Sequence, residues 1–188
     1  MAQKSYLMPI LIILVLCCSS IVSVITLLIP KPKITPPPLP PIPLPKGQFV
    51  RIEHTKPATV INLSEFEVLD KSYENLSKGK TVTASSVNAS SPVANLVDGS
   101  YNNYTTINPL TENSWVEIDL GSEQEIRKFV MLNRYDGNKD KAVGIKVIII
   151  DKNRMEVKTT PIIEKEQIRY SFEFKTKESD EEEVWKGT

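Results

Sequence analysis

Four carboxylates that follow one another closely are the side chains best placed for acid–base chemistry in this sequence: Glu117, Asp119, Glu123 and Glu125. Glu117 and Asp119 point to the same face of a strand, because side chains alternate along a strand with a period of two. A pair of carboxylates can act as acid and base in glycoside hydrolysis. A solvated sheet face is the competing interpretation, and the rest of the sequence favours it.

Histidine and cysteine are too scarce for most other catalytic or metal chemistry. His54 is the only histidine, and Cys17 and Cys18 lie side by side in an apolar N-terminal segment. This argues against a catalytic triad, a histidine zinc site and most histidine acid–base schemes. It also leaves the folded part without a disulfide or a cysteine metal site. We therefore expect a protein that is not an enzyme.

Charge and length limit the remaining classes. The 188 residues include 23 lysines and arginines and 23 aspartates and glutamates, so the formal net charge is zero. A nucleic-acid-binding protein usually carries a clustered basic face, which this balance does not indicate. The part beyond the N-terminal segments, about 125 to 130 residues, suffices for one domain with one core.

Residues 6–29 carry no charged side chain and consist mainly of leucine, isoleucine and valine, after a short flank at 1–5. A run of about 20 apolar residues is long enough to cross the hydrocarbon core of a bilayer. A cleaved signal peptide with its apolar core at 6–16 is the alternative, but the run continues to Ile29, which a signal peptide does not need. We expect a retained transmembrane helix in a single-pass protein of the cell surface, an endomembrane or a virion membrane.

Two opposed signals leave the orientation open. Lys31 and Lys33 follow the apolar run, and the positive-inside tendency would place the domain in the cytosol. Four Asn-X-Ser/Thr sequons favour the other side of the membrane. Glycosylation is accordingly predicted at Asn62, Asn75, Asn88 and Asn103.

The expected domain is bordered by two segments of biased composition. Residues 30–46 contain nine prolines, which predicts a stiff polyproline II stalk that holds the domain away from a bilayer. A ligand for proline-recognising domains is the alternative reading of this tract. Residues 176–188 include the acidic run Asp180–Glu183 and are predicted to be a disordered tail.

Between residues 47 and 175, short β-type runs are separated by turn residues. The runs expected to form strands are 48–54, 60–68, 81–86, 115–120, 126–133, 145–151, 155–160 and 170–174. Val93–Val97 is expected to form a short helical turn, and Asp151–Arg154 a hairpin turn. About eight short strands with almost no helical periodicity predict an all-β fold, a jelly-roll β-sandwich.

Several stretches of this region carry a recognisable pattern. They are LSKGKTVTASS at 76–86, PVANLVDGS at 92–100, SWVEIDLGSEQEIRKFVMLNR at 114–134, and Gly144 before KVIIID. The region resembles the coagulation-factor C-type (discoidin) domain over most of residues 48–174. It is similar also to the fucose-binding lectins that share this galactose-binding-like jelly roll, and to membrane-tethered domains of the family in large double-stranded DNA viruses. The resemblance implies a binding module.

The resemblance implies a ligand site at Arg134, Asp136 and Lys141. In fucose-binding members the basic part of the sugar site reads Arg-X-Asp, four residues, then Arg or Lys, and these three residues fit that spacing. Two cations beside a carboxylate can donate to vicinal hydroxyls while the aspartate fixes the arginine. The histidine and the cysteine pair of those lectins are absent here. A structural ion pair between Arg134 and Asp136 is therefore the competing interpretation.

The resemblance also implies a calcium site, because some members hold a calcium ion near the Asn-Leu-Val-Asp-Gly loop. Calcium takes six to eight oxygen ligands. The expected ligands are Asn95, Asp98, Ser100, Thr105 or Thr106, and Glu173. A plain turn, in which Asp98 accepts local backbone N–H groups, is the alternative.

Together these features predict a membrane-anchored, non-catalytic recognition or scaffolding protein that displays a discoidin-like domain to a protein or glycan partner. The second hypothesis is a viral structural protein, a minor capsid or envelope component that links a membrane to an outer shell of capsid or envelope proteins. The third is an adaptor bound through its proline-rich tract. Calcium is the one cofactor considered, and no nucleic-acid partner is expected.

Overall fold

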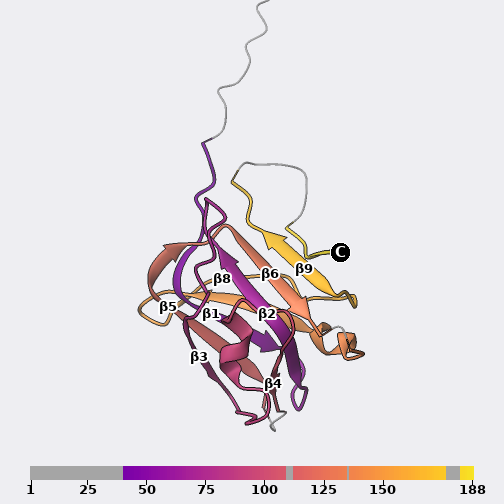
Figure 1. Ribbon diagram of the computed structural model, residues 1–188. Coiled ribbons are helices and arrows are strands. Elements are labelled where there is room, and N and C mark those ends of the chain that lie inside the picture. The colour runs from indigo at the N-terminus through magenta and orange to yellow at the C-terminus, as the bar shows by residue number, and fades with distance from the viewer. Residues whose placement is uncertain (1–39, 109–111, 135, 177–182) are drawn as a thin grey trace, which may run out of the picture. The chain divides into compact units, whose positions relative to one another are not determined.

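Short strands of alternating polar and apolar residues pair into two antiparallel sheets, as Figure 1 shows. The computed structural model describes residues 40–108, 112–134, 136–176 and 183–188. Sheet A has the order β3 (Thr81–Ala84), β5 (Trp115–Glu125), β1 (Lys46–His54), β7 (Ile145–Ile150) and β8 (Glu156–Thr159). Sheet B has the order β10 (Lys186–Gly187), β9 (Arg169–Glu173), β6 (Lys128–Asn133), β2 (Ile61–Leu69) and β4 (Thr105–Ile107). Two 3-10 helices, η1 (Val93–Val97) and η2 (Lys139–Ala142), lie in the connections.

The core lies between the two sheets. Alternation places Val50 and Ile52 of β1 on one side of it, and both are fully buried. Phe66 of β2 and Phe129 of β6 line the other side, with ring centroids 5.5 Å apart. Each such side chain contributes about 1.5–3 kcal/mol on burial. The two earliest strands are central, because β1 pairs with β5 and β7 while β2 pairs with β4 and β6.

The predicted all-β architecture is confirmed, and the turn predicted at Val93–Val97 is the helix η1. The prediction of a disordered tail over residues 176–188 is wrong for residues 183–188. There β10 pairs with β9, and Trp185 packs against the core. The acidic composition indicates disorder, but the packing of Trp185 and the pairing with the edge of β9 order this short segment.

The predicted stalk also ends earlier than residue 46. The N–H of Ile42 donates to the carbonyl of Thr176 at 2.9 Å, and the carbonyl of Pro45 accepts from the N–H of Ile126 at 2.9 Å. Leu44 packs against the core, and β1 begins at Lys46. Proline lacks an N–H but keeps its carbonyl, so the end of the tract can join the domain edge.

No helix within the described residues is long and apolar enough to cross a membrane. The predicted anchor at 6–29 and the stalk up to residue 39 lie outside the described part of the chain.

Candidate functional site

Connections from several parts of the chain are hydrogen-bonded to one another at one end of the sandwich, here called the loop end. Thr55, which follows β1, donates through N and Oγ1 to the carbonyl of Gly144 at 2.9 and 2.8 Å. The hydroxyl of Ser86, after β3, donates to the carbonyl of Asn108 at 2.9 Å. These hydrogen bonds restrain loops that strand pairing alone would leave free. The loop end is therefore a preorganised surface.

Arg134 is the most constrained charged side chain of the loop end. Its Nε donates to Oδ1 of Asp136 at 2.8 Å, and its Nη2 donates to Oδ2 of the same carboxylate. Its guanidinium lies 3.6 Å from the centroid of the Tyr104 ring. Hydrogen bonding to Asp136 raises the pKa of Arg134, and the same bond lowers the pKa of Asp136.

Asn62 holds the remaining edge of Arg134. With its amide oriented so that both ends find partners, Oδ1 accepts from Nη1 of Arg134 at 2.9 Å and Nδ2 donates to the carbonyl of Thr105 at 3.2 Å. Asp136 and Asn62 together engage Nε, Nη1 and Nη2, and the Arg134 side chain is only 15% exposed. Few of the five N–H donors of this arginine remain for an outside ligand.

Lys141 does not join this group. It lies in η2, and its Nζ pairs with Asp140 at 2.8 Å. None of the contacts among the described residues joins Lys141 to Arg134 or Asp136. The structure thus brings together two of the three predicted ligand residues, as an ion pair.

Asn133 positions two of the connections at the loop end, a role that no motif in the sequence indicates. The residue is 2% exposed at the end of β6. Its Nδ2 donates to the carbonyl of Lys139 at 2.7 Å and to the carbonyl of Gln167 at 3.2 Å. Its Oδ1 accepts from the N–H of Arg134 at 3.0 Å. One buried amide therefore connects the β6–β7 and β8–β9 connections.

His54 lies buried at the end of β1, under the β6–β7 connection. Its Nδ1 accepts from the N–H of Lys56 at 3.1 Å, while Nε2 has no hydrogen-bond partner among the described residues. A Cβ at Gly144 would lie 2.7 Å from Cε1 of His54, so glycine permits this contact. Burial lowers the pKa of His54 below its usual value. The ring is a neutral packing element beneath the loop end.

The residues predicted to hold calcium are not assembled into one site. Asp98 accepts from the N–H of Ser100 at 2.7 Å and from Nδ2 of Asn103 at 2.6 Å, and the amide of Asn95 donates to the carbonyl of Tyr104. Thr106 is paired with Asn62 in the β2–β4 ladder.

Glu173 is separate from that group and is held by Arg127 and Lys128 at 2.8 and 3.6 Å. No cluster of three or more metal-ligating side chains occurs in the described residues. The predicted set does not fit a calcium ion, because its second carboxylate is neutralised elsewhere.

Glu65 is a buried carboxylate that the sequence did not single out. It lies on β2 under the connection after η1, where the N–H of Gly99 donates to Oε1 and Oε2 at 3.2 and 3.3 Å. Tyr101 of the same connection donates to Glu67 at 2.9 Å. Burial raises the pKa of Glu65 to about 8, with Asp98 and Glu67 adding repulsion and Lys78 opposing it.

The two carboxylates considered for catalysis, Glu117 and Asp119, have different partners and different structural roles. Glu117 and Asp119 share the outer face of β5, as predicted, but Glu117 is only 5% exposed rather than solvated. Arg51 and Arg154 hold it at 2.8 and 2.5 Å. Asp119 accepts from the side chain of Gln48 at 3.1 Å. Glu117 is therefore the centre of a structural ion network.

The four predicted glycosylation sites differ in accessibility. Three of them have a buried hydroxyl residue at the third position of the sequon: Ser64 after Asn62, Ser77 after Asn75, and Thr105 after Asn103. Asn62 is itself only 6% exposed, so the folded domain cannot display a glycan there. In the Asn88 sequon, Ala89 and Ser90 are exposed. Asn88 is itself half-buried, like Asn75 and Asn103, and differs from them in the exposed residues that follow it.

Comparison with known proteins supports the family expected from the sequence. The family model described as "F5/8 type C domain" matches residues 81–179. Searches of curated proteins and of solved structures found no significant match. The matched residues include most of both sheets, while β1 and β2 precede them.

Proposed function

Because the chain belongs to the F5/8 type C domain family, we propose that it is a non-catalytic recognition module that binds a protein partner through its loop end. Domains of this family are generally binding modules for proteins, lipids or glycans, and nothing positive indicates catalysis here. The loop end suits binding because its connections are hydrogen-bonded to one another before any partner arrives, which limits the entropy lost on association.

The observation that favours a protein over a fucose-like glycan is the internal use of Arg134. Its nitrogens engage Asp136 and Asn62, and its face is covered by Tyr104. Asp136 and Asn62 engage three of its five N–H donors, so a sugar would meet at most two, on a side chain that is 15% exposed. Lys141, the second cation of the lectin pattern, is paired with Asp140 instead.

The proposal extends to how the domain is displayed. The apolar run at 6–29 would anchor the chain in a membrane, and the prolines of residues 30–41 would act as a spacer. The same arrangement would suit a component that links a viral membrane to an outer shell, in which case the partner would be a capsid or envelope protein.

A glycan array probed with residues 39–188 tests the choice of partner. These residues form one compact unit with its own core. The proposal expects no sugar to bind in a way that depends on Arg134. A sugar that binds this fragment and is lost on Arg134→Ala, with thermal unfolding unchanged, would replace the protein partner with a glycan.

A further inference from the structure

The last six residues of the chain occupy the edge of sheet B as an extended segment, here called the C-terminal segment (residues 183–188). Lys186 and Gly187 pair with Ser171 and Tyr170 of β9. The N–H of Thr188 donates to the carbonyl of Arg169 at 3.1 Å, which continues the ladder. The segment is thus bound as an added strand, through backbone hydrogen bonds that do not depend on side-chain identity.

Alternate side chains of the C-terminal segment face the domain. Glu183 pairs with Lys158 of β8 at 3.1 Å. Trp185 donates from Nε1 to the carbonyl of Pro161 at 2.9 Å, and its ring meets Tyr170 edge-on and Phe172 at 5.4 Å. Gly187 lies so close to Gln167 that a Cβ there would meet its side chain at 2.3 Å. Positions 183, 185 and 187 share one face by the period of two, and they read acidic, tryptophan, glycine.

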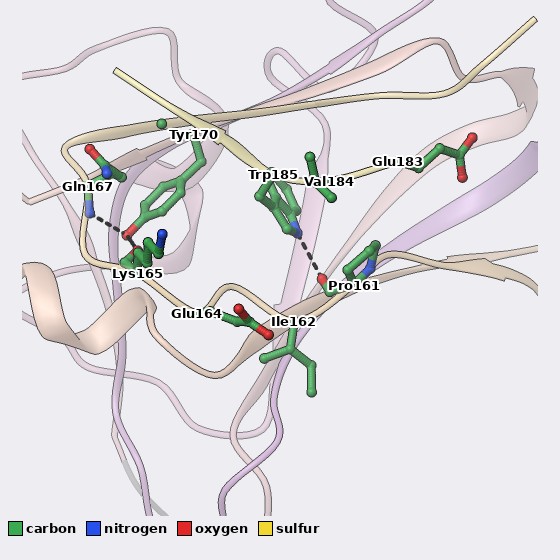
Figure 2. Close-up of a pocket in the computed structure, with 10 residues that line it drawn as sticks. Pro161, Ile162, Glu164, Lys165, Gln167, Tyr170, Glu183, Val184 and Trp185 are labelled. Carbon is green, nitrogen blue, oxygen red and sulfur yellow. Dashed lines mark hydrogen bonds between the residues drawn. The ribbon is translucent and has the colours of Figure 1, made fainter. Parts of the chain in front are cut away.

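The segment does not fill the hollow in which it lies. A pocket of about 740 Å³ lies between the β8–β9 connection and the C-terminal segment. Figure 2 shows residues that line it, among them Pro161, Ile162, Glu164, Tyr170, Val184 and Trp185. Ile162 and Val184 remain 47% and 44% exposed. The indole N–H and the Tyr170 hydroxyl are both hydrogen-bonded, as the dashed lines in Figure 2 mark. The pocket therefore offers apolar side chains for contact, next to the edge of β9.

We propose that the edge of β9 and the Pro161–Gln167 connection form a peptide-binding groove that the chain's own C-terminal segment occupies in cis. The partner that fits it is an extended peptide with an acidic residue, tryptophan two positions later and glycine two positions after that. The bound segment supplies this pattern directly, through Lys158, Pro161 and Gln167. The groove shares the β8–β9 connection with the loop end, but the inference goes beyond the proposed function because its binding edge is β9 and it does not use Arg134.

The cis segment should be displaceable because its strand is short. β10 has only two residues, both exposed, and edge elements with few buried contacts open at low free energy. A tethered segment acts at an effective concentration of about 1 mM or more. A free peptide therefore competes poorly for the groove until the contacts of the C-terminal segment, above all those of Trp185, are weakened.

A labelled peptide with the sequence of residues 183–188 tests the proposal, with binding to the 39–188 fragment followed by fluorescence anisotropy. We expect Trp185→Ala in the fragment to free the groove and tighten peptide binding by about ten-fold or more over the unchanged fragment. Gly187→Val is a second variant, which keeps the indole and weakens the segment through Gln167. Thermal unfolding of each variant shows that the domain remains folded.

The decisive control is the peptide in which tryptophan is replaced by alanine, which should not bind. A concentration-dependent dimer of the unchanged fragment that Trp185→Ala abolishes would also support the groove, with a second copy as its occupant. Equal affinity for the unchanged and variant fragments, no saturable binding to either folded variant, or undiminished binding of the alanine peptide would each overturn the proposal.

Discussion

Two buried glutamates, one on the outer face of each sheet, are stabilised in different ways. Glu117 of sheet A lies between Arg51 and Arg154, so its charge is balanced by two cations. Glu65 of sheet B accepts from the N–H of Gly99 but has no ion-pair partner among the described residues, and its pKa rises to about 8. Glu117 is stabilised as a carboxylate by salt bridges, whereas Glu65 is stabilised at neutral pH mainly because its carboxyl group is protonated.

The difference follows from what covers each strand. Arg154 reaches Glu117 from the β7–β8 hairpin, where it has a φ of 66°. Glu65 is covered by a connection that brings backbone N–H groups and a second carboxylate, Asp98, instead of a cation. Removing water without supplying a positive charge favours the neutral form of an acid. The two faces should therefore respond in opposite ways to loss of the carboxylate charge.

The largest expected effect is on the sheet A network. Arg51→Met should lower the free energy of unfolding of the 39–188 fragment by about 2–3 kcal/mol, because it leaves a buried carboxylate with one partner. Urea unfolding at pH 7 measures this loss. Lys46→Met is the matched control, since Lys46 and Glu125 form an exposed pair with side chains 63% and 41% exposed. The control should change stability by less than about 1 kcal/mol. Equal losses would contradict the assignment of Glu117 as a buried ion-network centre.

Glu65→Gln should stabilise the domain at high pH. An acid whose folded pKa is raised from 4.5 to about 8 binds its proton more tightly in the folded state, so stability falls as pH rises through this range. Glutamine removes this loss of stability, and the gain should already reach about 2 kcal/mol at pH 6 while staying near zero at pH 4. Thermal unfolding across this range measures it. Glu117→Gln should instead destabilise at pH 8, and a loss of stability in both variants would remove the contrast.

His54 should add a pH dependence of opposite sign. Burial lowers its pKa, so below its usual value near 6.5 the unfolded chain binds a proton that the folded chain resists. Stability should fall as the pH drops below the usual pKa of histidine, and His54→Gln should remove this slope. If the slope persists in His54→Gln, another group near the loop end causes it.

The smallest effect concerns the backbone of Arg154. Replacing this side chain with alanine or glycine removes the same contacts to Glu117 and Phe49. Glycine tolerates a φ of 66°, whereas alanine there carries a penalty of about 1 kcal/mol. Arg154→Ala should therefore unfold at lower urea than Arg154→Gly. Identical midpoints would mean that the hairpin relaxes out of the left-handed conformation.

Local pattern predicted the sheets well because alternation and turn residues act over a few positions. Residues 115–120 alternate cleanly, and the core side of β5 is the one expected. The Arg134–Asp136 pair could be predicted in the same way, since its members are two residues apart. Asn62 of β2 and Tyr104, which directly precedes β4, complete that group, and their positions depend on the register of β2, β4 and β6.

The misses share one physical cause, which is packing between segments far apart in the chain. Glu65 is buried only because the connection after η1 crosses β2. Trp185 sits in a segment whose composition indicates disorder, yet it finds Tyr170 and Phe172 on the free edge of β9. The same kind of packing separates the predicted calcium ligands, because Glu173 lies next to Arg127 rather than next to Asp98.

The central claim is that a partner protein binds the loop end, and cross-linking at two matched positions tests it most directly. Val87 at the loop end and Met155 in the β7–β8 hairpin are 68% and 65% exposed, so a photoreactive residue at either position is equally available. Irradiation of the full chain in its native membrane or particle should give one discrete protein adduct from position 87 and none from position 155. An adduct from position 155 alone, or none from either position, would contradict the account.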